Sequence, residues 1–159
     1  MYRRFLLAML ASVPAIALAQ GEEPTGPQPV LPKEKLMIVT RDGVRHELDV
    51  EMALTMQQQI VGEMFRPAVP ENGGMLFDWG TPRESRMWMR NTLAPLDMIF
   101  INPDGTIRSI AENAVPESLA VISSRGTVRA TLEVAAGTAA RLNIRVGDKV
   151  LQRVFGNAP

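Results

Sequence analysis

The chain has 159 residues, with 17 basic residues, 17 acidic residues, one histidine and no cysteine. The balanced charge gives no basic surface for nucleic acid or for an anionic membrane. The absence of cysteine rules out disulfides, a cysteine nucleophile and a thiolate metal site. A chain of this length can form one domain of ordinary size, held together by core packing.

The first 19 residues predict a secretory signal peptide. Arg3 and Arg4 precede an apolar stretch that is too short to cross a bilayer comfortably, and the stretch ends in the small-x-small sequence Ala17-Leu18-Ala19. We expect cleavage near Ala19, a periplasmic or secreted protein, and no stable membrane span after cleavage; an uncleaved N-terminal anchor is the alternative. Without the two arginines, 15 basic residues stand against 17 acidic ones, so the mature chain carries a charge of about −2.

Residues 20–35 are rich in Pro, Gly and Glu, which predicts a flexible linker. Residues 36–156 are expected to fold as a single globular domain. Two strands open it, over 36–40 and 44–50, and the Asp-Gly pair between them is a strong hairpin signal.

Two short helices are expected. Thr55, followed three residues later by Gln58, is a capping-box pattern, and apolar residues then recur at helical spacing, so we predict a helix near 55–64. The second helix is expected over 136–142.

The rest of the domain consists of short apolar runs between turn signals. These runs predict further strands near 75–79, 85–91, 96–102, 106–110, 119–123, 128–134 and 149–155. Many short strands separated by tight turns are typical of sandwiches and barrels. The expected fold class is α+β, mainly antiparallel β, in a compact barrel-like domain with two short helices.

The stretch MWMRNTLAPLDMIFI, residues 87–101, places polar side chains inside an apolar run. If 96–101 is a strand, Asp97 shares a face with two isoleucines and is at least partly buried. A buried carboxylate needs partners. The candidates are Arg66, Arg90 and the backbone N–H groups of the turn at 91–94.

Two interpretations of this stretch remain open. The polar residues either hold a turn between two core strands or converge at the mouth of a ligand pocket, where a Trp beside a few polar groups is typical. The second interpretation predicts a binding site made of Arg66, Trp88, Arg90, Asn91, Thr92 and Asp97.

Several motifs together resemble the signature of the domain of unknown function 192 family. They are MFR at 64–66, GMLF at 74–77, WMRNT at 88–92, PLD at 95–97 with Phe100, LEV at 132–134, and GDKV at 147–150, and the resemblance spans roughly 36–154. Two positions depart from the family pattern: Glu63 stands where leucine is usual, and Met87 where an aromatic is usual. The charge of Glu63 argues against full burial of that helix end. The resemblance implies the fold and an export habit, and it implies no activity.

The function is most simply a binding module for a small molecule or a sugar, with no cofactor, no resident metal and no identified protein partner. One alternative is a hydrolase of cell-wall or sugar substrates that uses Asp97 and a second carboxylate, although no carboxylate pair stands out by spacing. Another is a periplasmic Cu(I)-binding protein that uses Met87, Met89 and Trp88. Catalysis is the less favoured choice because no acid–base constellation is recognisable.

Overall fold

The computed structural model describes residues 23–158, which build one seven-stranded sheet with two short helices and a final 3₁₀ turn. In chain order the elements are β1 (Lys33–Val39), β2 (Arg45–Ala53), α1 (Met56–Val61), β3 (Gly73–Met87), β4 (Leu96–Ile101), β5 (Ile107–Ala114), β6 (Ile122–Ala135), α2 (Thr138–Arg141), β7 (Lys149–Leu151) and η1 (Arg153–Phe155).

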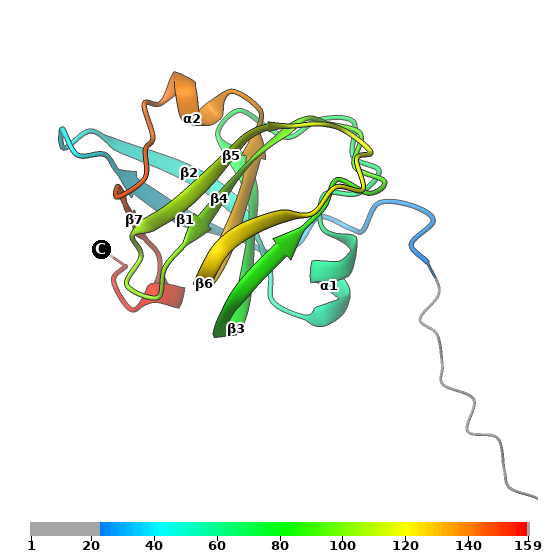
Figure 1. Ribbon diagram of the computed structural model, residues 1–159, viewed down its shortest axis with the longest axis horizontal. Coiled ribbons are helices and arrows are strands. Elements are labelled where there is room, and N and C mark those ends of the chain that lie inside the picture. The colour runs from blue at the N-terminus through cyan, green and yellow to red at the C-terminus, as the bar shows by residue number, and fades with distance from the viewer. Residues whose placement is uncertain (1–22, 159) are drawn as a thin grey trace, which may run out of the picture.

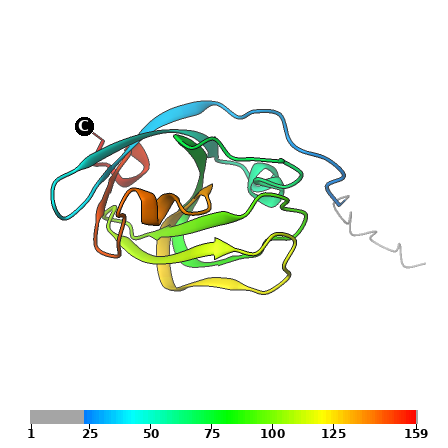
Figure 2. The ribbon, with the colours of Figure 1, turned by 90° about the horizontal axis from the view of Figure 1, so that it is seen from above.

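The strands lie in the order β5-β4-β6-β3-β2-β1-β7, and every neighbouring pair is antiparallel except β2 with β3. The sheet curls on itself, and α2 lies over the opening of the curl when the molecule is seen from above (Figure 2). A bridge between Thr106 and Lys149 joins the β5 end of the sheet to the β7 end. The predicted fold class is confirmed: the protein is mainly antiparallel β, barrel-like and carries two short helices (Figure 1).

Strand β4 shows how the sheet buries both of its faces. All six of its residues are buried. Ile99 and Ile101 belong to the main core inside the curl, whereas Leu96, Met98 and Phe100 belong to a second cluster on the other face. The predicted alternation along this strand is therefore confirmed. The outer face needs its own cover, and the loop residues Val69 and Met89 provide part of it.

Two predicted pairs of strands are single strands in the structure. β3 runs unbroken from Gly73 to Met87, and β6 from Ile122 to Ala135. Register shifts between Asp78 and Arg83, and between Glu84 and Arg86, let these strands bend without ending. The turn signals in the sequence thus mark bulges in two long paired strands.

Helix α1 has the predicted capping box, since the Thr55 side chain accepts a hydrogen bond from the Gln58 backbone N–H and the Gln58 side chain accepts one from the Thr55 backbone N–H. The helix ends at Val61, three residues earlier than predicted, because Gly62 takes a positive φ of 50°. Residues 62–65 continue as turns. Glu63 follows Gly62 in this turn, and its side chain is buried close to α1.

The first strand begins at Lys33, within the range predicted as a flexible linker. The preceding residues also contact the domain: Leu31 is buried, and the Gln28 amide donates to the carbonyls of Gln58 and Gly62. The predicted signal peptide, residues 1–19, lies outside the described residues. Among the helices of residues 23–158, none has the length and apolar content to span a membrane.

Candidate functional site

A cavity of about 270 Å³ lies between α1 and the outer face of β3 and β6. Ile60, Val61 and Met64 of the α1 region line one side, and Phe77 and Trp79 of β3 line the opposite side. Its volume is close to the lower limit, roughly 300 Å³, of pockets that take small molecules. The cavity is therefore large enough for a small ligand and has the apolar walls that such sites use.

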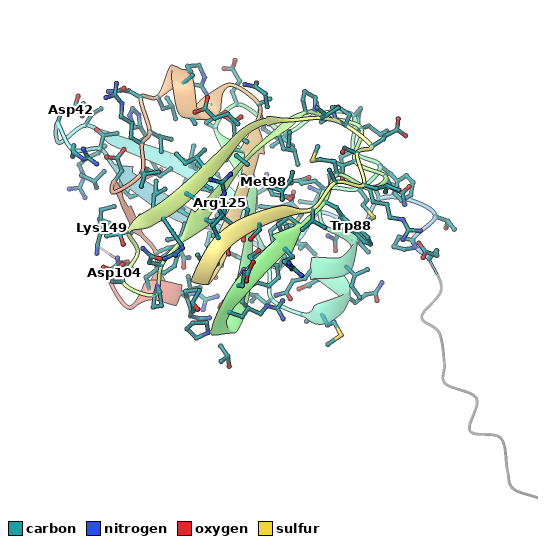
Figure 3. All side chains as sticks on the ribbon, viewed as in Figure 1. Asp42, Trp88, Met98, Asp104, Arg125 and Lys149 are labelled. Atoms are coloured by element: carbon teal, nitrogen blue, oxygen red, sulfur yellow. The ribbon has the colours of Figure 1, made fainter. Side chains whose placement is uncertain are left out.

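The mouth of the cavity carries aromatic and cationic groups. Trp88 lines it and is 47% exposed, and Figure 3 shows its position near α1. The guanidinium of Arg83 lies over the Trp79 ring at 4.4 Å, and Arg86 lines the same mouth from β3. Arg83 and Arg86 are exposed, so the positive charges lie at the rim.

Glu133 of β6 lies at the floor of the cavity and is only 4% exposed. In register it stands between Met75 of β3 and Met98 of β4, so its flanking strands give it an apolar setting. Burial raises the pKa of the Glu133 carboxyl well above its ordinary value, and the charge of Glu63 raises it further. Among the described residues, no donor gives this carboxyl a hydrogen bond. The cavity thus ends on a buried acid without a partner.

Glu63 is the second acid at the floor, and it is also 4% exposed. Its Oε2 lies 3.1 Å from Nη1 of Arg66 but outside hydrogen-bond geometry, and it has no other partner among residues 23–158. Burial raises the pKa of Glu63 to about 7, although the Arg66 charge opposes the rise. The charge of Glu63 argued against full burial of this helix end, and this expectation is wrong, because Arg66 and a raised pKa make the burial tolerable.

Arg66 lies behind the floor and is held mainly by Glu51 of β2. Its two terminal nitrogens lie 2.7 and 2.9 Å from the two carboxylate oxygens of Glu51, a bidentate geometry. Burial alone would raise the pKa of Glu51, but hydrogen bonds from Arg66 and from the Leu31 N–H hold it below its ordinary value. Arg66 is therefore committed to Glu51 and offers the cavity only a shared contact with Glu63.

The local backbone explains the placement of this cluster. A Cβ on Gly62 would come within 3.0 Å of the Phe77 ring, and its φ is positive, so glycine suits the close turn between α1 and Glu63. The turn continues to Phe65, whose N–H donates to the Asn91 carbonyl at 2.8 Å. This bond joins the α1 turn to the WMRNT loop, which supplies Trp88.

The structure brings some of the six predicted site residues to the cavity and leaves others away from it. Trp88 and Thr92 line the cavity. Asn91, with φ of 53°, lies next to it, with its Nδ2 4.0 Å from the sulfur of Met64. Arg90 lies 5.4 Å from the centre of the Trp88 ring and pairs with Glu23 at 2.6 Å.

Asp97 is fully buried, as predicted, but its partners are not the arginines or the 91–94 turn. Its two oxygens accept hydrogen bonds from the backbone N–H groups of Asn113, at the end of β5, and Ala139, in the first turn of α2, each at 2.9 Å. The predicted pairing of Asp97 with Arg66 or Arg90 is wrong because both arginines have nearer carboxylates. Asp97 joins β4 to two other elements and does not line the cavity.

Sequence reasoning did not assign to the site either of the two acids that reach the floor. Glu133 stands in a strand where polar and apolar residues alternate, TLEVA, which predicts a solvated face and conceals its burial. For Glu63, the available signal is the family position itself, where a charge replaces leucine. Neither signal shows that the two acids meet, because α1 and β6 are far apart in the sequence.

The metal-binding alternatives can be placed as well. Met89 is fully buried in the second core cluster, whereas Met87 lines the cavity together with Met56 and Met64. Within residues 23–158, no group of three or more His, Cys, Asp or Glu side chains could hold a metal ion.

Comparison with known proteins gives a family and solved relatives. The model of a family described as uncharacterised ACR, domain of unknown function 192, matches residues 37–152. A crystal structure of a proposed transcription regulator from Sinorhizobium meliloti 1021 is 45% identical, with a TM-score of 0.77, and the match covers 80% of this chain and 98% of that one. A protein of unknown function from Novosphingobium aromaticivorans DSM 12444 is 36% identical, with a TM-score of 0.74 and coverage of 89% and 94%. No curated protein matches the chain.

Proposed function

The chain belongs to the domain of unknown function 192 family, and on that premise we propose that it is a binding module for a small polar molecule. The binding site is the cavity between α1, β3 and β6. The observation that carries the proposal is a pair of buried acids, Glu63 and Glu133, at the floor of this cavity with unfilled hydrogen-bonding capacity.

Buried polar groups in folded proteins nearly always have partners, and an exception calls for a role. Here the two acids face a space with aromatic and thioether walls, which is the usual make-up of a small-ligand pocket. A ligand that donates hydrogen bonds to the floor would satisfy both acids and bury its own apolar surface against Phe77 and Trp79. Because these contacts are non-covalent, the module could bind its ligand and release it again.

A thermal-shift screen of residues 20–159 tests the proposal. The panel holds neutral sugars, cell-wall fragments, amino acids, small anions and Cu(I), the last because three methionines line the cavity. We expect one class to raise the melting temperature by several degrees. Trp88→Ala should abolish the rise, and Leu119→Ala, which removes another exposed apolar side chain, should keep it. A wild-type protein that responds to no class would contradict the proposal.

Hydrolysis is the second candidate function, because two carboxyls share one cavity and the pKa of Glu63, about 7, suits a general acid at neutral pH. The version that uses Asp97 loses support, since both oxygens of Asp97 accept backbone hydrogen bonds. Hydrolysis of cell-wall fragments by the wild type, lost in Glu63→Gln and retained in Glu112→Gln, would favour the enzyme. Binding without turnover would favour the module.

Two broader points belong to the same proposal. Export to the periplasm or the medium rests on the charge and apolar pattern of the N-terminal residues, and the N-terminus of the mature protein, expected at Gln20, can be read by mass spectrometry. The regulator description of the Sinorhizobium relative is not carried over to this chain, because 17 basic and 17 acidic residues leave no excess charge for nucleic acid.

A further inference from the structure

We propose that the ligand of this cavity is a zwitterion, a small amino acid with an apolar side chain, whose ammonium group lies against Glu63 and Glu133 while its carboxylate faces Arg83 and Arg86. This inference rests on the proposed function and names the chemical class of its ligand. It follows from how charge changes with depth in the cavity.

The floor has more acidic side chains than cations to pair with them. Among the described residues, Arg66 is paired with Glu51 and lies 3.1 Å from Glu63, while Glu133 lines the same cavity without a cation beside it. The two nitrogens of Arg66 are already engaged by Glu51, so Glu63 has only a shared contact, and Glu133 has no ion-pair partner among residues 23–158. An ammonium group would add three hydrogen-bond donors and the positive charge that lets these acids ionise, whereas a neutral hydroxyl would add a donor without charge.

The walls favour the same group. Phe77 and Trp79 form a tilted aromatic pair with ring centres 5.8 Å apart, and both line the cavity beside the acids. Aromatic rings attract cations through their negative faces, and the attraction is stronger where water is excluded. The side chains of Ile60, Val61 and Met64 line the cavity opposite these rings, where an apolar ligand side chain can pack.

The rim has the opposite charge. Arg83 and Arg86 line the mouth, are exposed, and come from β3 on either side of buried Ser85. Arg86 has only an exposed partner, Glu84, at 3.8 Å, and exposed pairs of this kind are weak. A simple amine would gain nothing from these arginines, and an anion would meet the acids below them. A zwitterion satisfies both ends.

Isothermal titration with L-leucine, L-methionine and L-phenylalanine, on the protein from residue 20 to 159, tests the inference. We expect at least one of them to bind, N-acetyl-leucine to show no binding because it lacks the ammonium group, and leucinamide to bind at least tenfold more weakly than leucine. Burial raises the pKa values of Glu63 and Glu133, and an adjacent ammonium group would favour their charged forms. Binding should therefore ionise them. The released protons make the measured enthalpy depend on the buffer, and affinity should rise between pH 5.5 and pH 8.

Variants assign these effects to side chains. Glu133→Gln keeps the shape of the side chain and should weaken leucine binding at least tenfold, and Arg83→Gln should weaken leucine but not leucinamide. Glu112→Gln and Arg45→Gln, which change exposed residues outside the cavity lining, are the matched controls and should bind as the wild type does.

Each of the other outcomes contradicts a specific part of the inference. Neutral sugars that bind in a Glu133-dependent way, with no response to amino acids, would overturn the zwitterion and leave the binding module standing. Equal affinity for leucine and leucinamide would overturn the role of the rim arginines and reduce the ligand to a simple amine. No binding by any compound would overturn both the inference and the proposed function.

Discussion

At the scale of single residues, the cavity depends on two acids that the fold buries at a cost in stability. Glu63 is the easier of the two to follow by pH titration, because burial raises its pKa from an ordinary 4.5 to about 7. The folded protein therefore holds the proton of Glu63 more tightly than the unfolded chain does. The stability gained from this proton is fully present below pH 4.5 and is lost as the pH rises through 7.

We therefore predict that the free energy of unfolding falls by roughly 3 kcal/mol between pH 4.5 and pH 8 through Glu63 alone. Urea denaturation across this range measures the fall, and Glu63→Gln should reduce it by about that amount; Glu133 accounts for the part that remains. The lowered pKa of Glu51 places its own titration below this window.

Glu112→Gln, which changes an exposed glutamate on β5, should keep the wild-type slope. A wild-type stability that rises across the same range would show that Glu63 is ionised and well paired in the folded protein.

At the scale of elements, Asp97 fixes α2 and the end of β5 to the fully buried strand β4. Its burial could be predicted from the strand alternation, since it shares a face with Ile99 and Ile101. Its partners could not, because they are backbone groups 16 and 42 residues away and carry no sequence signature. Arg66 and Arg90 were predicted as partners because a sequence reveals charged side chains but not which backbone N–H groups will lie close.

Asp97→Asn is predicted to destabilise the protein by about 2–4 kcal/mol, because the amide can accept only one of the two backbone hydrogen bonds and turns its N–H₂ toward the other donor. Ligand affinity should stay unchanged at a temperature where the variant is folded, since Asp97 does not line the cavity. Urea denaturation and titration of the same sample measure both, with Asp49→Asn, at a half-exposed aspartate on β2, as control. Loss of ligand without loss of stability would move Asp97 into the site.

Gly74 permits the close approach of β3 and β6 below the cavity. A Cβ at this position would collide with the backbone carbonyl of Glu133, and that carbonyl cannot move without disturbing the β3–β6 ladder. We predict that Gly74→Ala destabilises the protein by more than about 2 kcal/mol and also weakens ligand binding, because it displaces the floor. Gly26→Ala, where a Cβ meets nothing within 4 Å, should leave both properties unchanged. A fully stable Gly74→Ala would show that the two strands tolerate wider spacing.

At the scale of the whole molecule, strand signals and the α1 capping box were enough to predict the fold class. They did not predict that β3 and β6 run as long bent strands, because bulges and turns share the same residues in sequence. Nor did composition show that the segment before β1 is held by the domain. Leu31 is buried and Gln28 caps the end of α1, although the surrounding Pro and Gly residues are typical of a linker.

A chain that begins at Lys33 should therefore be less stable than one that begins at Gln20. Loss of the buried Leu31 side chain alone should lower the free energy of unfolding by roughly 2 kcal/mol. In addition, α1 loses the Gln28 hydrogen bonds at its C-terminal end. Thermal denaturation of the two chains measures the difference. Equal melting temperatures would mean that the segment contributes nothing to the fold, and a chain that begins at Gly26 serves as the control, since it retains both contacts.

Intrinsic tryptophan fluorescence tests the cavity as a ligand site most directly. The sequence has two tryptophans, Trp79 and Trp88, and both line the cavity. Tryptophan emission therefore reports on the cavity alone. Titration with the compound that gives the largest thermal shift should change the emission in a saturable way, and Glu133→Gln should shift the midpoint to higher concentration. A ligand that stabilises the protein while the emission of both tryptophans stays constant would place the binding site elsewhere and contradict the cavity as the functional site.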